Sequence, residues 1–330
     1  MLPDLAELLR TARVVALPMT TRFRGITVRE AVLFEGPQGW TEFSPFVEYD
    51  DDESAAWLHA AIDFGWREAP EPLRDRIPVN ATVPAVAAAD VAAILDRYPG
   101  VRTAKVKVAE PGQTLADDLA RVSAVRDHLG PEGRIRVDAN TFWNVDEAEH
   151  AIHALAPFDL EYVEQPCATV EELAEIRRRT AYMGVPIAAD ESVRKAADPL
   201  AVAQAGAADL LIVKAQPLGG IHSALRIVAA AGLPVVVSSA IDTSVGIAMG
   251  AHLAAAVPNL EFDCGLGTVA MFVHDVADEP LLPVDGFIPV RRPTVSAERL
   301  NALAADADRR QWWLDRLRRC YRVVERATAL

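Results

Sequence analysis

Two lysines lie two positions apart in the stretch TAKVKV, residues 103–108. If this stretch is a β-strand, Lys105 and Lys107 point to the same face, because side chains alternate along a strand. Partial burial and a neighbouring like charge both lower a lysine pKa, and a neutral lysine can act as a general base. Protective lysines on a solvated edge strand are the alternative interpretation.

Three acids and a third lysine follow at similar intervals, in VDAN, VEQP, ADES and IVKAQ. One acid after a strand is usually a helix cap or half of a surface ion pair. Three carboxylates at one end of a barrel would repel one another unless a cation lay between them, so Asp138, Glu164 and Asp190 together predict a metal site. Oxygen ligands without His or Cys favour Mg²⁺, with Mn²⁺ as the alternative, and disfavour zinc.

These residues lie within a regular alternation of β-branched runs and alanine-rich, helix-periodic segments that begins near residue 77. The predicted strands end at Val83, Lys107, Asp138, Glu164, Asp190, Lys214, Ser238 and Asp263. Eight units of near-constant length predict an α/β fold, a (β/α)₈ TIM-type barrel over residues 77–285, and no glycine-rich phosphate motif is present. Catalytic groups of such barrels lie at the C-terminal ends of the strands.

The remaining segments are expected to form a cap and a C-terminal extension. Residues 1–76 contain the strand-like RVVALPM and REAVLFEG and the helix-periodic DESAAWLHAAIDFGWRE, which predict a small α+β capping domain. Residues 286–330 end in a long helical segment that is predicted to begin near Ser296 and to pack on the barrel and the cap.

The composition excludes several classes of protein. With 33 basic and 47 acidic residues the formal net charge is −14, so nucleic acid and anionic membranes are poor partners. The three cysteines, Cys167, Cys264 and Cys320, lack metal-site or redox spacing. No signal-peptide pattern is present, and the longest apolar run, residues 227–241, is shorter than the roughly 20 residues that span a bilayer. We expect a cytoplasmic enzyme, with monomer and homo-oligomer both open.

Strand counting places two of the lysines opposite each other. In a ring of eight strands, Lys107 on the second and Lys214 on the sixth face each other across the mouth, and the acids lie between them. A metal-bound substrate carboxylate would present its α-carbon between these amines. The sequence therefore predicts a small-molecule carboxylate substrate and removal of its α-proton, with electrostatic stabilisation of the enediolate that forms.

At these residues the chain resembles the enolase superfamily, with a small cap, a barrel, KVK on strand 2, acids on strands 3 to 5 and a lysine on strand 6. Within it the chain is most similar to the o-succinylbenzoate synthase family of menaquinone biosynthesis, through TRFRGITVREAVL, RVDAN, EQP, ADES, SSAIDTSVG and DCGLGT. The resemblance implies a Mg²⁺-dependent syn dehydration of 2-succinyl-6-hydroxy-2,4-cyclohexadiene-1-carboxylate to o-succinylbenzoate. Such an enzyme is a carbon-oxygen lyase.

The resemblance also implies roles for individual residues. Lys107 corresponds to the base that removes the α-proton, Lys214 to the lysine that stabilises the enediolate from the opposite side, and Lys105 to a neighbour that tunes the base. The acids named above correspond to the metal ligands. Further expected site residues are Ser238 and Ser239 as carboxylate donors, Phe23 and Arg24 in a closing loop, and Arg136, Asn140 and Glu191 as supports of the ligands. Arg136 is alternatively structural, and the serines are alternatively a helix cap.

Three other functions stay open at this stage. An N-acylamino acid racemase or dipeptide epimerase of the same superfamily would use the two opposed lysines as a two-base pair, although DCG in place of a DxD after strand 8 favours the synthase. A metal-free Schiff-base aldolase would use Lys214 as its nucleophile. A non-catalytic barrel that binds a carboxylate is the third.

Overall fold

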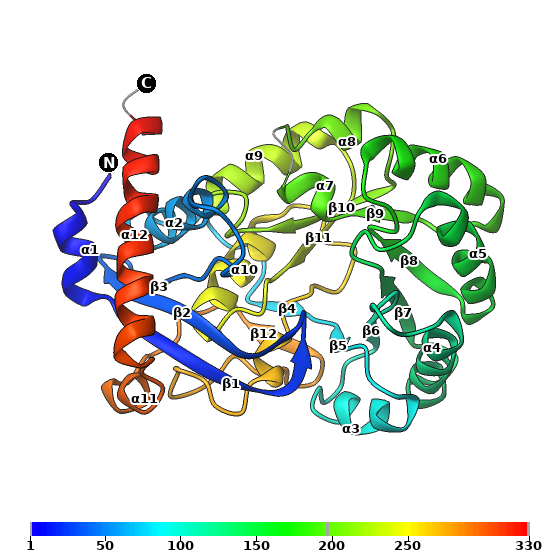
Figure 1. Cartoon of the computed structure of the whole chain (residues 1–330), viewed down its shortest axis with the longest axis horizontal. Coiled ribbons are helices and arrows are strands. Elements are labelled where there is room, and N and C mark those ends of the chain that lie inside the picture. The colour runs from blue at the N-terminus through cyan, green and yellow to red at the C-terminus, as the bar shows by residue number, and fades with distance from the viewer. Residues whose placement is uncertain (1, 196–197, 329–330) are drawn as a thin grey trace.

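An antiparallel sheet of three strands forms the N-terminal part of the chain in the computed structural model, which describes residues 2–195 and 198–328. The strands are β1 (Arg13–Phe23), β2 (Ile26–Gly36) and β3 (Gly39–Phe43), paired in that order. Helix α1 (Leu5–Thr11) precedes this sheet, and α2 (Asp51–Trp66) packs on it. We call residues 5–66 the cap, which lies beside the larger part of the molecule in Figure 1. Both predicted strands and the predicted helix are confirmed.

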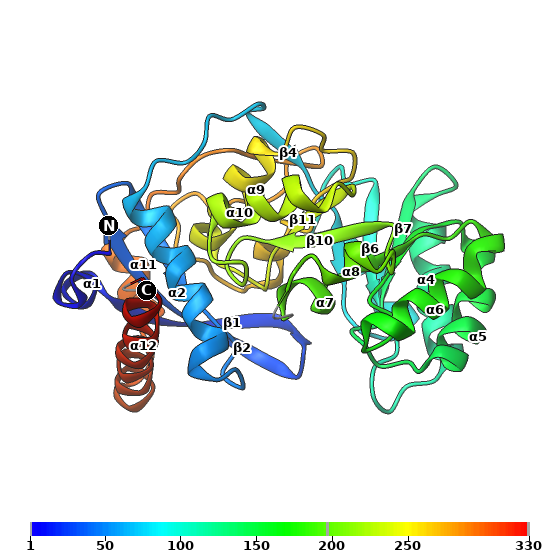
Figure 2. The ribbon, with the colours of Figure 1, turned by 90° about the horizontal axis from the view of Figure 1, so that it is seen from above.

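The C-terminal segment returns to the cap. It contains α11 (Ala297–Ala302) and α12 (Ala307–Thr328), and α12 packs along α2, as Figure 2 shows from above. Helix α11 begins where predicted, because the Ser296 side chain accepts a hydrogen bond from the Arg299 amide at 3.1 Å. Trp313 and Leu317 of α12 are fully buried in the apolar core of the cap. The sequence predicted one continuous helix here, and the structure has two.

Seven parallel strands form the second sheet, in the order β11-β10-β9-β8-β7-β6-β5. They are β5 (Ala81–Val83), β6 (Thr103–Lys107), β7 (Arg134–Asp138), β8 (Leu160–Glu164), β9 (Ile187–Ala189), β10 (Leu210–Lys214) and β11 (Val235–Ser238). Six of these strands end at the predicted residue, and Asp190 lies one position beyond β9. Because β6 pairs on both sides, the edge-strand interpretation of KVK is wrong. The α/β class is confirmed, with a curled parallel sheet.

The predicted first and eighth strands differ from expectation. The first is divided into β4 (Arg76–Pro78), which pairs with β12 (Phe287–Pro289), and β5. The predicted eighth strand, LEFDC, is not a strand: Cys264 bridges Val79 and Gly265 bridges Ser238, so only two residues connect the two edges of the sheet. The Asp263 carbonyl instead accepts a hydrogen bond from the Arg136 side chain at 2.7 Å, which withdraws it from the ladder.

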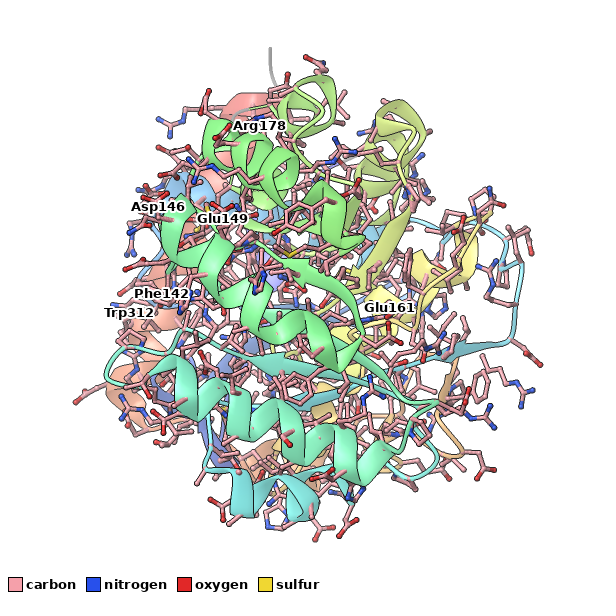
Figure 3. The ribbon with its side chains drawn as sticks, turned by 90° about the vertical axis from the view of Figure 1, so that its right-hand side faces the viewer. Phe142, Asp146, Glu149, Glu161, Arg178 and Trp312 are labelled. Carbon is pink, nitrogen blue, oxygen red and sulfur yellow. The ribbon has the colours of Figure 1, made fainter. Side chains whose placement is uncertain are left out.

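Helices connect the strands and cover the outside of the sheet. They are α3 (Val91–Leu95), α4 (Leu115–Leu129), α5 (Val145–Leu155), α6 (Val170–Thr180), α7 (Glu191–Arg194), α8 (Ala201–Gln204), α9 (Ile221–Ala231) and α10 (Ser244–Ala256), with short 3₁₀ turns at 88–90, 156–158, 181–183 and 268–271. Helices α4, α5 and α6 each begin with a capping box, in which Thr or Asn pairs with the acid three residues later. Figure 3 shows this outer layer, with Asp146 and Arg178 on its exposed side.

Apolar side chains fill both faces of the parallel sheet. The larger cluster lies between strands and outer helices and includes Val106 and Val137. A smaller cluster occupies the inner face, formed by Tyr162, Ala188, Leu210, Ile212 and Val236. Because side chains alternate along a strand, the residues two positions after these inner ones continue on the same inner face. This alternation decides which side chains reach the end of the sheet.

Within residues 2–195 and 198–328, none of the helices has the length and apolar character that crossing a membrane requires.

The fold generates a prediction at the contact between the cap and α9. Gly220 has φ +108°, and a Cβ there would lie 2.6 Å from Asp63 Oδ2 of α2. We expect Gly220→Ala to lower the free energy of unfolding by about 2–4 kcal/mol, through backbone strain and displacement of Asp63. Gly184→Ala is the matched control, because Gly184 also has positive φ but no atom lies within 4 Å of its added Cβ. Equal losses in urea denaturation would contradict a close cap contact.

Candidate active site

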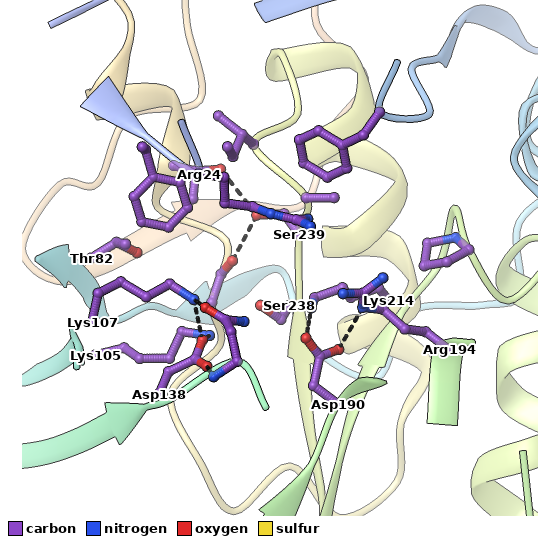
Figure 4. Close-up of a pocket in the computed structure, with 18 of the residues that line it drawn as sticks. Arg24, Thr82, Lys105, Lys107, Asp138, Asp190, Arg194, Lys214, Ser238 and Ser239 are labelled. Atoms are coloured by element: carbon purple, nitrogen blue, oxygen red, sulfur yellow. Dashed lines mark hydrogen bonds and ion pairs between the residues drawn. The ribbon is translucent and has the colours of Figure 1, made fainter. Parts of the chain in front are cut away.

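Polar side chains continue the inner face at the C-terminal end of the sheet. Glu164 follows Tyr162, Asp190 follows Ala188, Lys214 follows Ile212 and Ser238 follows Val236, each by two positions. Strand register extends the row, because Lys107 pairs with Asp138 and Asp138 with Glu164. The sequence predicted these residues, and the structure brings them to one edge of the sheet, as Figure 4 shows for those that it labels.

Lys105 lies between two of the predicted ligands. Its Nζ donates to Asp138 Oδ2 at 2.9 Å and to both Glu164 oxygens at 2.8 and 2.9 Å. Burial by itself would lower the pKa of Lys105, but the carboxylates of Asp138 and Glu164 outweigh it and hold that pKa well above its usual value. Lys105 is therefore an ammonium ion that compensates buried carboxylates.

Lys107 lies nearer the opening of the site. Its Nζ donates to Asp138 Oδ2 at 2.6 Å, also contacts Asn140 Oδ1, and is 5.4 Å from the centre of the Phe23 ring. Burial lowers the pKa of Lys107; Asp138 opposes this effect and the Lys105 ammonium adds to it. The direction agrees with the sequence prediction of an easily deprotonated Lys107, with burial as the largest cause.

Lys214 approaches from the other side of the site. Its Nζ is 2.5 Å from Asp190 Oδ2, and in Figure 4 this pair lies across the pocket from Lys105, Lys107 and Asp138. Burial would raise the pKa of Asp190, but Lys214 and Arg194 reverse the effect and lower it. The two lysines that strand counting placed on opposite sides do lie on opposite sides.

The other two acids differ in their titration. Burial would raise the pKa of Asp138, but the ammonium groups of Lys105 and Lys107 hold it far below its usual value. Burial raises the pKa of Glu164 to about 7, and the Asp138 carboxylate adds to this shift. A cation near Glu164 would favour its ionised form.

The donor set fits a hard divalent cation in chemistry. Asp138, Glu164 and Asp190 are all buried and supply only oxygen. Asp190 Oδ1 accepts no well-aligned hydrogen bond from any described residue and has only the ion pair with Arg194 Nε at 3.2 Å, so this buried oxygen retains capacity for a ligand. In the described part of the chain no three His, Cys, Asp or Glu side chains converge closely enough to form a metal cluster, because the ammonium groups lie between these acids.

The predicted substrate residues also line the cavity. Ser238 and Ser239 lie at the end of β11, and Ser239 Oγ donates to the Gly265 carbonyl at 2.8 Å and lies 3.0 Å from Thr268 Oγ1. Phe23 and Arg24 come from the β1–β2 turn of the cap. Arg24 lies over the Phe46 ring at 4.1 Å. An inner cavity of about 50 Å³ opens toward a cleft of about 770 Å³, and Phe23, Arg24 and Lys107 line both.

The supporting residues divide into two groups. Asn140 and Glu191 lie beside the lysines and acids, and Asn140 Nδ2 donates to Glu191 Oε1 at 3.3 Å. Arg136 is fully buried but bonds Glu161 at 2.5 Å and Asn80 at 3.1 Å, at the opposite end of the sheet from the predicted ligands. Arg136 therefore does not pair with the ligand acids as expected: its partners are Glu161, Asn80 and the Asp263 carbonyl.

Sequence reasoning missed Arg194. This residue, 9% exposed, ends α7 and lines the cavity; it donates to Glu191 Oε1 at 2.6 Å and to the Tyr49 hydroxyl of the cap at 3.0 Å. The spacing of Arg194 three positions after Glu191 and four after Asp190 is typical of a helical ion pair and could have revealed it. Its contact with Tyr49 had no signal in the sequence.

Comparison with known proteins identifies the class. Residues 86–294 match the model of the enolase C-terminal domain-like family, and residues 14–65 match the enolase N-terminal domain-like family. The structure superposes on a muconate lactonizing enzyme from Pseudomonas fluorescens with a TM-score of 0.75 at 21% identity, covering 89% of this chain and 98% of that one. It superposes on an N-succinyl Arg/Lys racemase from Bacillus cereus with a TM-score of 0.74 at 18% identity, covering 90% of this chain and 98% of that one. The chain belongs to the enolase superfamily.

Sequence relatives identify the family within it. The chain is 57% identical to the o-succinylbenzoate synthase of Mycobacterium leprae over 98% of this chain and 95% of that protein. It is 58% identical to the o-succinylbenzoate synthase of Mycobacterium tuberculosis over 98% of this chain and 97% of that protein. It is 56% identical to the o-succinylbenzoate synthase of Mycolicibacterium smegmatis over 98% of both chains. By these similarities the chain belongs to the o-succinylbenzoate synthase family, as its motifs predicted.

The electrostatics of the site predict the effect of removing Lys105. In Lys105→Met two buried carboxylates lose their shared cation, so we expect the metal-free protein to lose about 3–5 kcal/mol of unfolding free energy in urea. Lys195→Met is the control: its side chain is 41% exposed and 3.8 Å from Glu53, so it should lose no more than about 1 kcal/mol. Similar losses for both variants would show that Lys105 compensates no buried charge.

Proposed function

We propose that this protein is an o-succinylbenzoate synthase, which dehydrates 2-succinyl-6-hydroxy-2,4-cyclohexadiene-1-carboxylate to o-succinylbenzoate. Lys107 and Lys214, which approach one cavity from opposite sides above a row of acids, support removal of a proton α to a carboxylate. The observation that carries dehydration as the reaction is the near-full-length identity of 56–58% to curated synthases. The enzyme is accordingly a carbon-oxygen lyase.

In the proposed mechanism Lys107 removes the proton α to the substrate carboxylate. A lowered pKa favours the neutral amine, and Lys107 lines both the inner cavity and the cleft, within reach of a bound substrate. The electron pair of the broken C–H bond enters the carboxylate as an enediolate. Protonated Lys107 then donates its proton to the departing hydroxyl on the same side of the ring, so that water leaves and the ring becomes aromatic.

Lys214 is proposed to stabilise the enediolate from the side opposite Lys107. Its ammonium group acts without proton transfer, by favouring negative charge where that charge develops. Ser238, 6% exposed in the wall of the cavity, is placed to donate its hydroxyl proton to a carboxylate of the substrate. Ser239, which is half-buried beside it, would do so by turning its single hydroxyl proton away from the Gly265 carbonyl. Lys105 is assigned the role of favouring the ionised forms of Asp138 and Glu164 and of adding to the lowering of the Lys107 pKa.

We propose that Asp138, Glu164 and Asp190 hold a divalent cation, Mg²⁺ or Mn²⁺. When bound, such a cation supplies Lewis-acid stabilisation of the enediolate. Membership of the enolase superfamily supports this assignment, because enolase-type sites combine a lysine or histidine base with magnesium. The ammonium groups now in contact with these acids would move aside to admit the ion.

We further propose the domain organisation predicted from the sequence. Residues 1–76 form the capping domain, 77–285 the barrel and 286–330 the segment that packs on them. The bridges of Cys264 and Gly265 to both edges of the parallel sheet support a barrel with eight positions, in which this two-residue segment takes the eighth.

Racemisation through both lysines is the competing activity, because the same pair could remove a proton from one face and return it to the other. Solvent deuterium exchange into N-acylamino acids separates the two functions. We expect rapid formation of o-succinylbenzoate from the cyclohexadiene substrate and slow exchange. Fast exchange without dehydration would replace the synthase by a racemase.

Substitution of the base gives a prediction about catalysis. We expect Lys107→Ala to lower kcat by at least about 10²–10⁴-fold, the range that a general base contributes, while o-succinylbenzoate still binds. Turnover is followed by absorbance and binding by calorimetry. Loss of binding together with turnover would assign Lys107 to substrate affinity, and retained turnover would exclude it as the base.

Removal of the metal gives a second prediction. EDTA should abolish turnover and added Mg²⁺ should restore it, and Mg²⁺ should raise the midpoint of thermal unfolding of the substrate-free protein because it binds only the folded state. Asp190→Asn should lose most of this shift. Full activity in EDTA with borohydride trapping at Lys214 would support the Schiff-base aldolase instead.

A further inference from the structure

The loop between β11 and α10 is strained where it forms the wall of the inner cavity. Ser239, Ala240 and Ile241 line the cavity, and Ile241 has φ +61°, a left-handed conformation that β-branched residues rarely adopt. Strain of this kind costs about 1–3 kcal/mol and persists only where the surroundings hold it. Several of the contacts that hold this loop come from the cap.

Arg29 of β2 binds the loop on both sides of the strained residue. It is 3% exposed; its Nε donates to the Ile241 carbonyl at 3.1 Å and its Nη2 to the Ala240 carbonyl at 3.3 Å. The guanidinium also contacts the Ser44 carbonyl and lies 4.4 Å from the centre of the Phe46 ring. One rigid cap side chain thus fixes two successive carbonyl groups of the cavity wall.

Glu42 of β3 binds the end of the same loop. Its Oε2 accepts hydrogen bonds from the amides of Thr243 and Gly246, both at 3.1 Å, and from the Thr243 hydroxyl. Helix α10 begins at Ser244, so these amides belong to a first turn that lacks partners within the helix, where a carboxylate is favourable. Glu42, a residue of the cap, therefore satisfies the N-terminal amides of α10, a helix that covers the parallel sheet.

Charge balance connects these contacts. Asp242 accepts from the Ala240 amide at 3.3 Å and is buried beside Glu42. Burial raises the pKa of both carboxyl groups, to about 7 for Glu42, where the Asp242 charge adds to the shift. The Arg29 cation opposes both shifts, and Lys214 also opposes that of Asp242. Arg29 thus compensates both buried acids, Asp242 within the loop and Glu42 at the end of the loop.

We infer that Arg29 and Glu42 are positioning residues, which hold the 239–243 loop from the cap so that Ser239, Ala240 and Ile241 shape the wall that contacts substrate. The contacts of Arg29 and Glu42 with the loop are observed in the structure. Their effect on the binding of substrate and of o-succinylbenzoate rests on the proposed function. Lys107 and Lys214 lie on other strands, β6 and β10. Loss of the positioning residues should therefore weaken substrate and product binding more than it slows the chemical step.

The test uses Arg29→Lys and Glu42→Gln in the full chain. Arg74→Lys is the matched control, because Arg74 donates to the carbonyls of Ala254 and Val257, each at 2.7 Å, at the other end of α10. Hydrogen exchange of peptides covering residues 238–246 is measured by mass spectrometry, with KM, kcat and the Kd of o-succinylbenzoate. Losing a hydrogen bond to a charged group should accelerate exchange there by about 10- to 100-fold and raise KM and Kd about tenfold or more.

The control should accelerate exchange only near the end of α10 and leave KM unchanged. Unchanged exchange at 238–246 and unchanged KM in both cap variants would overturn the inference, as would a fall in kcat alone. If either variant does not fold, Thr243 gives a second test: Thr243→Ser keeps the hydroxyl that bonds Glu42 and should resemble the parent. Thr243→Val loses both that bond and the bond that the hydroxyl accepts from the Val245 amide, so its exchange should be faster than that of the parent by more than a lost helix cap, about 1 kcal/mol or fivefold, explains. Because exchange needs no substrate, a parent protein that forms no o-succinylbenzoate would refute the proposed function and leave this contact tested.

Discussion

Compensation of buried charge at one end of the parallel sheet is the constraint on which the site depends. Three carboxyl groups and three lysine amines share a small volume, and none of them can be ionised there without an opposite charge nearby. Lys105 lies between Asp138 and Glu164, and Lys214 contacts Asp190. At Lys107 burial outweighs the contact with Asp138 and, together with the Lys105 ammonium, lowers the pKa. The buried charges that pair with one another at this end of the sheet thus also influence the pKa of the proposed base, Lys107.

The cap extends this dependence beyond the sheet. Phe23 and Arg24 close the cavity from above, Tyr49 accepts from Arg194, and Arg29 and Glu42 bond the loop after β11. The bonds of Tyr49, Arg29 and Glu42 each pair a polar group of the parallel-sheet part that is buried where the cap packs on it. The cavity is therefore complete only when both parts of the chain are packed together, and the shape of its wall is encoded partly in strands that carry none of the acids or lysines.

Much of the fold could be predicted from local patterns. Period-two alternation and near-constant spacing located the ends of β6, β7, β8, β10 and β11, because a half-buried strand and its following helix impose those patterns directly on the sequence. The eighth strand could not be predicted in this way: LEFDC has strand-like composition, but Arg136 takes the Asp263 carbonyl and only two residues pair. Competition between a side chain and the backbone ladder acts over more than one hundred residues and leaves no local signal.

The sequence by itself determined which strands end in charge, and hence the opposed lysines, the three acids and the family, because strand periodicity fixes the face and spacing fixes the order around the sheet. Only the tertiary structure decided which charges pair, that Arg136 bonds Glu161 instead of the ligand acids, and that Arg194 joins the cavity. It also decided that Arg29 and Glu42 hold a strained loop about two hundred residues away. Pairing depends on distances between side chains, and those distances exist only once the cap and the sheet have packed.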